Sequence, residues 1–535
     1  MNLKRFIITA LSAMFIFSFS ACGNDDVSDG MNYTFSYALD SNPQNLDPQI
    51  ATDSTSLTVI ENMFEGLLSV NENGWLDYGA AESCDISDDC LTYTFTLRND
   101  KYWYNGNDDE FPLTADDFVF AFQRIFNPVT QSPYRETFSF LKNGQKIING
   151  NADYTEIGVY APDKQTVVFE LDYAQPCFME LLATAPAMPC NQEFFESTNA
   201  RYGLDDESVI SNGAFYMKQW FYDEYGKDNF ITMKANNFNS AGNEICPSGI
   251  NFIIENSDTD IEENFRNGDY DCLYSDEQSN YKNILSRSFE INEYSDCTTG
   301  IIINPEQITN DNLKKALSLS IDREEFSSKL ASDYQAAYGI VPPSASVGNS
   351  LYRDIQPDNL IARYDIEQAL TALGSCENIP QLTLITSPDY AETLYISQIA
   401  EMWQDKLKTD IKVIETDSAD YKRRIAERDY QLAVYDISAD YSNPYDVLEK
   451  FSSDSNSFGY SDETTDNLLK LSETINGTEK KCGIYAETEK NIIDNCGFIP
   501  IYYKKAYFIS SNDSEDIIFN PFNHTVNFRY GKNYS

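Results

Sequence analysis

A carboxylate at the end of a predicted strand gives this chain a group that can recognise a positively charged solute. Residues 429–444 read Asp-Tyr-Gln-Leu-Ala-Val-Tyr-Asp-Ile-Ser-Ala-Asp-Tyr-Ser-Asn-Pro, and the part from Tyr430 to Ile437 is rich in strand formers. Asp440 follows, within a run of turn formers that ends at Pro444. At the mouth of a cleft, such a carboxylate attracts an ammonium group more strongly than in open water. The alternative interpretation is a solvated aspartate in the loop after a strand.

The sequence contains too few histidines for most histidine-based catalytic or metal sites. His524 is the only histidine, which excludes a His-based catalytic triad elsewhere and a metal site with several His ligands. The closely spaced cysteine pairs also lack the Cys-x-x-Cys spacing of a zinc or redox site. We therefore predict no metal and no cofactor. A carboxylate-based surface hydrolase remains an alternative, because acidic residues are abundant.

The composition is that of a folded, strongly acidic protein. Its 535 residues suffice for two or three domains, and 14% of them are aromatic whereas 23% are charged. The 38 basic and 85 acidic residues give a formal net charge of −47. Such a surface repels nucleic-acid phosphates, so we predict no nucleic-acid partner. The charge is compatible with attraction of cationic solutes and equally with a simple role in solubility.

The elements that position Asp440 are predicted from hydrophobic periodicity. Residues 33–39 alternate as in a strand, and residues 81–98 are expected to form a turn followed by a strand. A buried strand is expected over Ile301–Pro305, near the start of a second lobe. Phe and Tyr residues around the helix at 113–124 are expected to form core. The predicted helices cover Leu57–Leu68, Leu113–Arg124 (with Thr114 as its N-cap), Asn310–Lys329, Ile366–Leu373 and Tyr395–Leu407.

The N-terminus has the pattern of an export signal. Lys4 and Arg5 precede the apolar run Phe6–Phe19, which is too short to span a membrane comfortably. The Ser-Ala-Cys-Gly sequence that follows resembles a bacterial lipoprotein signal, which implies residues 1–22 as signal peptide with Cys22 as the lipidated first residue. Residues 23–30 are a polar tether. An ordinary signal peptide with an incidental cysteine is the alternative.

Several segments resemble, in consistent order, the extracellular solute-binding proteins that serve peptide-importing ABC transporters, the oligopeptide-binding group. The run from Ala439 to Pro444 is similar to the family's Ala-Asp-Tyr-x-x-Pro segment, whose Asp pairs with the α-ammonium of the peptide. Ile437 stands where the family often has Trp. The other similar segments are Leu46–Leu68, Ala81–Arg98, Trp103–Gly106, Asn212–Trp220, Asn264–Leu273, Ala316–Arg323, Ile340–Pro343 and Asn520–Tyr530.

This resemblance implies an α/β protein with a two-lobed periplasmic-binding-protein-like fold (class II) and an extra domain inserted in the N-terminal lobe. Residues 31–64, 189–285 and 507–535 are expected to form lobe I, 65–188 the extra domain and 286–506 lobe II. The backbone of the peptide is expected to pair with residues 52–54 and with the strand at 436–438. The predicted ligand-binding residues are Thr52, Asp53, Ser54, Asp436, Ile437, Ser438, Asp440 and Tyr441.

Disulfides are plausible in an exported chain, because ten cysteines remain besides Cys22. Cys84 and Cys90 stand where the family usually has Trp and Gly, so a bridge between them would account for both departures. Each of the local cysteines is otherwise structural or free. The candidate pairs are Cys84 with Cys90, Cys177 with Cys190, and Cys482 with Cys496.

The predicted function is capture of an oligopeptide between two lobes and its delivery to the permease subunits of an ABC importer. The protein is expected to be a monomer and not an enzyme, lipid-anchored at the extracellular face of the cell membrane (the periplasmic side if there is an outer membrane). The alternatives within the same fold are an oligosaccharide, a nickel chelate or a signalling peptide as ligand. A single histidine disfavours direct binding of nickel by imidazole.

Overall fold

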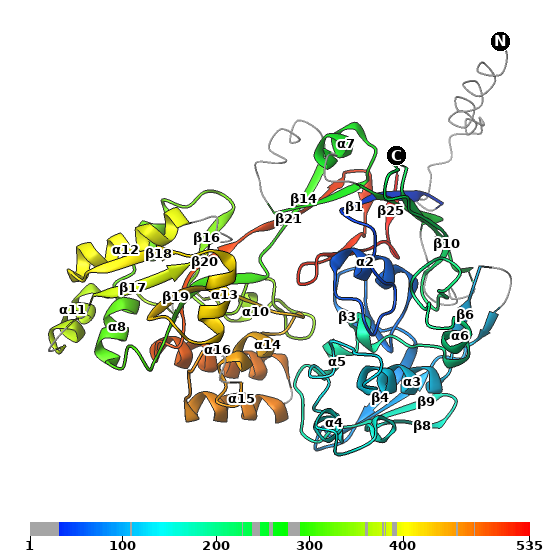
Figure 1. Ribbon diagram of the computed structural model, residues 1–535, viewed down its shortest axis with the longest axis horizontal. Coiled ribbons are helices and arrows are strands. Elements are labelled where there is room, and N and C mark those ends of the chain that lie inside the picture. Colours follow the sequence, from blue (N-terminus) through cyan, green and yellow to red (C-terminus); the bar gives the residue numbers. More distant parts are fainter. Residues whose placement is uncertain are drawn as a thin grey trace, which may run out of the picture.

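The computed structural model shows two lobes joined by a pair of strands (Figure 1). It describes residues 32–534 apart from 107–109, 227, 238–246, 256–259, 277–288, 359–361, 377–378, 380, 388–392, 456–457 and 476. Among these residues no helix is long and apolar enough to cross a membrane. The predicted signal peptide, Cys22 and the tether lie outside the described residues. The predicted boundaries of the lobes and of the extra domain remain a proposal.

The first lobe contains a four-stranded sheet of order β1-β12-β11-β10, in which only β1 and β12 are parallel neighbours. Strand β1 (Thr34–Leu39) buries Phe35 and Leu39, which confirms the strand predicted at 33–39. The remaining strands are β10 (Phe215–Phe221), β11 (Phe230–Ala235) and β12 (Gly249–Ile254).

Helix α2 (Ser54–Met63) begins three residues before the predicted helix and ends five residues earlier. The side chain of Asp53 caps it by accepting a hydrogen bond from the Ser56 N–H. The carbonyl of Met63 accepts a hydrogen bond from the N–H of Gly213, at 2.8 Å, instead of from a further helical turn. The prediction of a helix to Leu68 was therefore wrong, and Leu68 begins strand β2 (Leu68–Val70), which pairs with β3 (Leu76–Tyr78).

A second four-stranded sheet, of order β4-β5-β9-β8, lies below the first in Figure 1. Its strands are β4 (Ala81–Ile86), β5 (Thr92–Leu97), β8 (Val159–Asp163) and β9 (Thr166–Glu170). We predicted a turn where β4 lies, which was wrong. β4 is an edge strand with mostly exposed polar side chains, so it lacks the apolar alternation of its neighbour β5.

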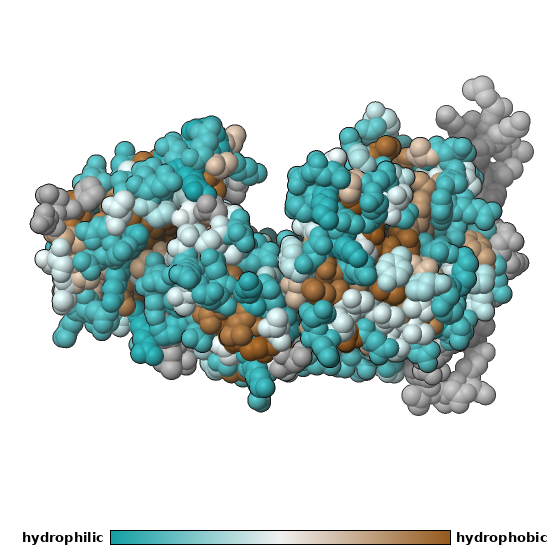
Figure 2. All heavy atoms as spheres, turned by 90° about the horizontal axis from the view of Figure 1, so that it is seen from below, coloured by the Kyte–Doolittle hydropathy of each residue, from teal (hydrophilic) through white to brown (hydrophobic). Residues whose placement is uncertain are grey.

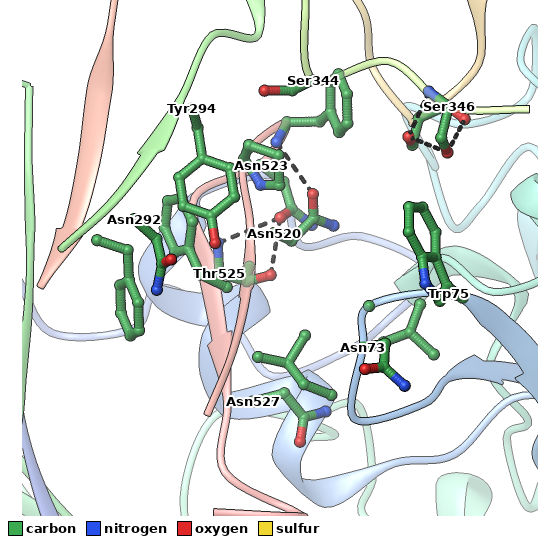
Figure 3. A pocket seen from close by; sticks show the side chains of 18 of the residues that line it. Asn73, Trp75, Asn292, Tyr294, Ser344, Ser346, Asn520, Asn523, Thr525 and Asn527 are labelled. Carbon is green, nitrogen blue, oxygen red and sulfur yellow. Dashed lines mark hydrogen bonds between the residues drawn. The ribbon is translucent and has the colours of Figure 1, made fainter. Parts of the chain in front are cut away.

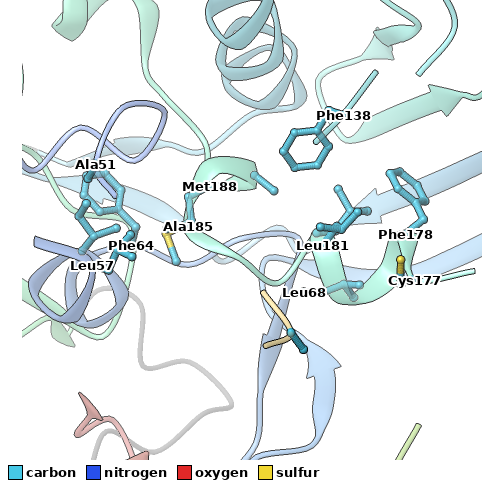
Figure 4. Close-up of a cluster of buried hydrophobic side chains, with 14 of the residues drawn as sticks. Ala51, Leu57, Phe64, Leu68, Phe138, Cys177, Phe178, Leu181, Ala185 and Met188 are labelled. Atoms are coloured by element: carbon cyan, nitrogen blue, oxygen red, sulfur yellow. The ribbon is translucent and has the colours of Figure 1, made fainter. Parts of the chain in front are cut away.

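Helix α3 (Ala115–Phe126) packs against this second sheet, and Thr114 is its N-cap as predicted. The phenylalanines of the region form edge-to-face pairs in a buried cluster, part of which Figure 4 shows. This confirms the prediction that they form core. The smaller elements nearby are β6 (Tyr102–Tyr104), β7 (Glu110–Pro112), α4 (Gly144–Ile148), α5 (Phe178–Leu181) and α6 (Gln192–Ser197).

The second lobe is built on a six-stranded sheet of order β16-β20-β15-β19-β17-β18. The central strand β15 is almost fully buried, as the apolar run at 301–305 predicted. The strands are β15 (Cys297–Ile303), β16 (Tyr334–Ala336), β17 (Leu382–Thr386), β18 (Ile411–Glu415), β19 (Leu432–Ser438) and β20 (Ile499–Lys504).

Helices surround this sheet (Figure 1). The helix predicted over 310–329 is divided in two, because Asp322 caps a new helix with its side chain. The predicted helices at 366–373 and 395–407 are confirmed as α11 and α12. The helices are α8 (Asp311–Leu319), α9 (Arg323–Ser327), α10 (Tyr352–Ile355), α11 (Ile366–Gly374), α12 (Thr393–Leu407), α13 (Ser418–Ala426), α14 (Pro444–Leu448), α15 (Glu463–Thr474) and α16 (Thr478–Asp494).

Two antiparallel strands, β14 (Phe289–Tyr294) and β21 (Ala506–Ser511), lead from one lobe to the other. Residues 295–296 connect β14 to β15, and residue 505 connects β20 to β21. Strand β13 (Cys272–Ser275) follows helix α7 (Ile261–Asn267) and pairs with the other edge of β21. The last strands are β22 (Ser514–Glu515), β23 (Ile518–Asn520), β24 (Thr525–Asn527) and β25 (Lys532–Asn533).

Candidate binding cleft

A cavity of about 800 Å³ lies where the two lobes and the connecting strands meet. Figure 2 shows the hollow between the lobes at the molecular surface. The lining comes from segments that are far apart in the sequence: the β2–β3 turn, helix α5, strands β14 and β21, the loop at 343–351, residues 440–442 and the C-terminal segment 514–527.

The floor of the cavity includes one face of the connecting strands. Glu290, Asn292 and Tyr294 alternate along β14, so their side chains share one face of the sheet. In the pairing register, Ser510 lies opposite Glu290 and Phe508 opposite Asn292, and both also line the cavity. This face offers carboxylate, amide, phenol and hydroxyl groups to a solute.

The side of the cavity formed by the first lobe is rich in amide and hydroxyl groups. Asn73 and Trp75 come from the β2–β3 turn, and the segment from Asn520 to Asn527 supplies further polar side chains (Figure 3). In α2, the carboxylate of Glu61 accepts hydrogen bonds from Asn523 at 2.9 Å and Thr525 at 2.6 Å. Burial raises the pKa of Glu61, and these two hydrogen bonds counteract the rise.

On the second lobe, residues 440–442 reach the cavity just after strand β19. The backbone N–H of Asp440 donates a 2.7 Å hydrogen bond to the carboxylate of Asp446 in α14, which fixes the turn. The side chain of Asp440 is exposed and forms no ion pair with any described residue. Tyr441 is fixed through its hydroxyl, which lies 2.9 Å from the Cys177 sulfur. Burial raises the pKa of both Tyr441 and Cys177.

Two of the eight predicted ligand-binding residues, Asp440 and Tyr441, line the cavity. Residues 52–54 lie at the start of α2, whose first residue is Ser54, and are not part of the lining. There, Thr52 and Ser54 are exposed, whereas Asp53 serves as the helix cap. Their predicted pairing with a ligand backbone stays a prediction.

The strand residues 436–438 also lie outside the cavity lining. Asp436 accepts a 2.5 Å hydrogen bond from the hydroxyl of Thr299, and the carbonyl of Ser438 accepts one from Lys450 at 2.7 Å. Ile437 is 1% exposed within the core, so its side chain forms no wall of a ligand pocket in this structure. Their role in binding stays a prediction.

The three candidate cysteine pairs are not bridged in the structure, in which all six cysteines are free thiols, the alternative that the sequence left open. Cys482 lies in α16 and Cys496 just beyond its end, and 14 residues of helix correspond to about 21 Å, too far for a disulfide. The Cys177 sulfur contacts Tyr441, whereas the Cys190 sulfur contacts the guanidinium of Arg124 at 3.3 Å. Cys84 lies in β4, paired with Phe95, and Cys90 lies in the following turn with φ 56°.

Sequence reasoning missed most of the cavity lining. The alternation of polar residues at Glu290, Asn292 and Tyr294 could have predicted one polar face of β14. By contrast, nothing in the sequence distinguishes Asn73 and Trp75 from residues of an ordinary turn. Only the fold brings these segments next to Asp440.

Two α/β lobes joined by two strands, with a cavity where they meet, define the architecture of a hinged binding protein, as predicted. The chain belongs to the bacterial extracellular solute-binding proteins, family 5, whose middle-region model matches residues 76–459.

Known proteins resemble the chain along nearly its whole length. The oligopeptide-binding protein OppA of Bacillus subtilis (strain 168) is 25% identical over 96% of this chain and 97% of its own. The unliganded open form of the periplasmic murein tripeptide-binding protein MppA matches with a TM-score of 0.78 at 23% identity, covering 94% of this chain and 97% of that chain. The Listeria monocytogenes OppA bound to peptide matches with a TM-score of 0.64 at 22% identity, covering 94% and 99%. These structures confirm the two-lobed periplasmic-binding-protein-like fold.

Proposed function

We propose that this protein captures oligopeptides in the cleft between its lobes and delivers them to the permease subunits of an ABC importer. The observation that carries the proposal is the exposed carboxylate of Asp440, which lines a cavity of about 800 Å³ without an ion-pair partner among the described residues. A peptide's α-ammonium is the complementary group. The oligopeptide-binding relative, similar over nearly the whole chain, supports this class of ligand.

Binding proceeds by closure of the lobes over the peptide. The structure superposes better on an unliganded open form than on a peptide-bound relative, with TM-scores of 0.78 and 0.64, which supports an open starting state. Closure changes the backbone mainly near residues 295–296 and 505, where the two strands pass between the lobes. The backbone at 52–54 and 436–438 then pairs with the extended peptide, which gives affinity independent of its sequence.

The proposal includes the cellular location. The protein acts as a monomer held by lipid at Cys22 to the extracellular face of the membrane, and residues 23–30 let it reach the permease. It performs no catalysis. The lobes take the boundaries expected from the sequence: 31–64, 189–285 and 507–535 for lobe I, 65–188 for the extra domain and 286–506 for lobe II.

The test of the binding site is calorimetry with one peptide in two forms, with a free and with an acetylated N-terminus. Asp440→Asn is expected to lower affinity for the free form by about 2–5 kcal/mol and to affect the acetylated form much less. Asp405→Asn, in helix α12 outside the cavity, is the control and should change neither. Equal losses for both peptide forms would show that Asp440 does not bind the ammonium group.

The class of ligand is tested by native mass spectrometry of the protein lacking residues 1–22, purified from its own cells, followed by denaturation. A series of short peptide masses is the expected result. A single non-peptide mass or a carbohydrate would refute peptide capture while leaving the fold unchanged.

A further inference from the structure

The lining of the cavity is strongly unbalanced in charge. Among the residues that the structure describes, eight carboxylate side chains contribute to the lining, against one ammonium group, that of Lys505. The carboxylates are those of Glu61, Glu72, Glu180, Glu290, Glu293, Asp440, Glu515 and Asp516.

Two of these carboxylates form ion pairs with described lysines, and the charge of Lys481 lowers the pKa of a third, Glu180. Lys505 lies 2.7 Å from Glu293, so the one cation of the lining is already paired. Lys532 pairs with Asp516 at 2.8 Å. The other six form no ion pair with any residue that the structure describes: Glu61, Glu72, Glu180, Glu290, Asp440 and Glu515.

The unpaired carboxylates are spread around the cavity rather than gathered at one point. Glu72 lies in the β2–β3 turn, Glu290 on strand β14 and Glu515 in β22, whereas Asp440 belongs to the second lobe. One carboxylate suffices for the α-ammonium of a peptide. The others face positions that the rest of an extended ligand would occupy.

Two of these six carboxylates, Glu61 and Glu180, are partly buried, whereas Glu72, Glu290, Asp440 and Glu515 are exposed. Burial raises the pKa of Glu61 and of Glu180, which shows that the surroundings disfavour their ionised forms. A cation that enters the cavity relieves this cost, and its attraction is stronger there than in water. A ligand carboxylate meets repulsion instead and has no unpaired Lys or Arg of the described lining to bind it.

We infer that the cavity selects positively charged peptides, those bearing several Lys or Arg side chains, and discriminates against acidic ones. The inference rests on the proposed function and concerns the same cavity: Asp440 takes the α-ammonium, and the remaining carboxylates choose among peptides by their side-chain charge. The abundant amide and hydroxyl groups of the lining serve any peptide backbone, so charge is the discriminating property.

The first experiment compares three peptides of equal length with free N-termini: Ala-Lys-Ala-Lys-Ala, Ala-Gln-Ala-Gln-Ala and Ala-Glu-Ala-Glu-Ala. Calorimetry at low ionic strength is expected to rank them in this order, each step at least tenfold in Kd. Added salt should compress the differences, because it screens the partly exposed carboxylates. Binding with equal affinities overturns the inference and leaves peptide capture standing. Binding of none of the three overturns peptide capture and, with it, the inference.

The second experiment assigns the preference to the lining. Combining Glu72→Gln, Glu290→Gln and Glu515→Gln removes three exposed carboxylates, which should leave folding intact. The Lys peptide is expected to lose at least tenfold in affinity, whereas the Gln peptide changes by less than about twofold. Glu367→Gln, at an exposed position of helix α11 outside the cavity, is the control and should retain the full preference. An unchanged preference in the triple variant would overturn the inference.

Discussion

Replacement of Glu65 by Gln tests whether a buried ion-pair network holds the first lobe together. The carboxylate of Glu65, just after α2, lies 2.5 Å from the ammonium of Lys101 and also contacts the guanidinium of Arg529. All three side chains are at most 8% exposed. Because Glu65 and Lys101 come from the first fifth of the chain and Arg529 from its end, the network joins distant segments.

The pKa of Glu65 gives the size of the effect. Burial alone would raise this pKa, but Arg529 and Lys101 outweigh burial and hold it at about 2, against an ordinary value of 4.5. The difference corresponds to about 3 kcal/mol of unfolding free energy. Since the folded pKa is the lower one, this stabilisation is present above pH 4.5 and is lost as the pH falls toward 2. Gln leaves two buried cations without a counterion, so the expected loss at pH 7 is about 3–5 kcal/mol.

Amide hydrogen exchange is the suitable assay, because a chain with several domains does not unfold in one step. At pH 7, Glu65→Gln should reduce the protection of α2 and of residues 525–529 by about 3–5 kcal/mol. Asp116→Asn is the control, since Asp116 pairs with Lys164 at the surface and should cost less than about 1 kcal/mol. A loss in Glu65→Gln no larger than that of the control would refute the reasoning.

Two further predictions concern Glu449, which follows helix α14, and Asp53, the cap of helix α2. Burial, with Asp446 nearby, raises the pKa of Glu449 to about 7. The folded protein therefore has its full stability below pH 4.5, where Glu449 is neutral, and loses part of it as the pH rises through 7. Glu449→Gln should show a smaller fall in Tm between pH 5 and pH 8 than the unsubstituted protein, and an equal fall would contradict this. Asp53→Ala should cost about 1 kcal/mol through the lost cap of α2, whereas Asp53→Asn should cost little. Because the predicted peptide contact there is made by the backbone, neither variant should change peptide affinity, and a tenfold loss in Asp53→Asn would show a side-chain contact.

The elements best predicted from the sequence include those with one face in the core and the other in solvent. Strand β1 and helix α3 were located to within a few residues because burial imposes a period of 2 or 3.6 on their apolar positions. Strand β15 was located from a continuous apolar run, because it is buried on both faces. Edge strand β4 was missed because most of its side chains are exposed, so its sequence lacks a regular pattern of apolar residues. The end of α2 was misplaced because a contact with Gly213, about 150 residues away in the chain, terminates the helix.

The cleft was less predictable than the fold. Asp440 and Tyr441 were found because they lie in one short segment with a recognisable pattern of residues. The remaining lining consists of single polar residues from many segments, and spacing along the chain does not show that Glu72 and Glu290 share a cavity. Of the candidate cysteine pairs, Cys482 and Cys496 are close in sequence but distant in space, because most of the intervening residues form helix α16.

The connecting strands both join the lobes and line the cavity. β14 and β21 are the segments that pass between the lobes, and their side chains Glu290, Asn292 and Phe508 also line the cavity. Lys505, at one crossing point, is paired with Glu293 of the neighbouring strand. A peptide that contacts this floor therefore touches the segments whose backbone must change on closure. Under the proposed function, the charge of the ligand bears on closure as well as on affinity, because both depend on the same strands.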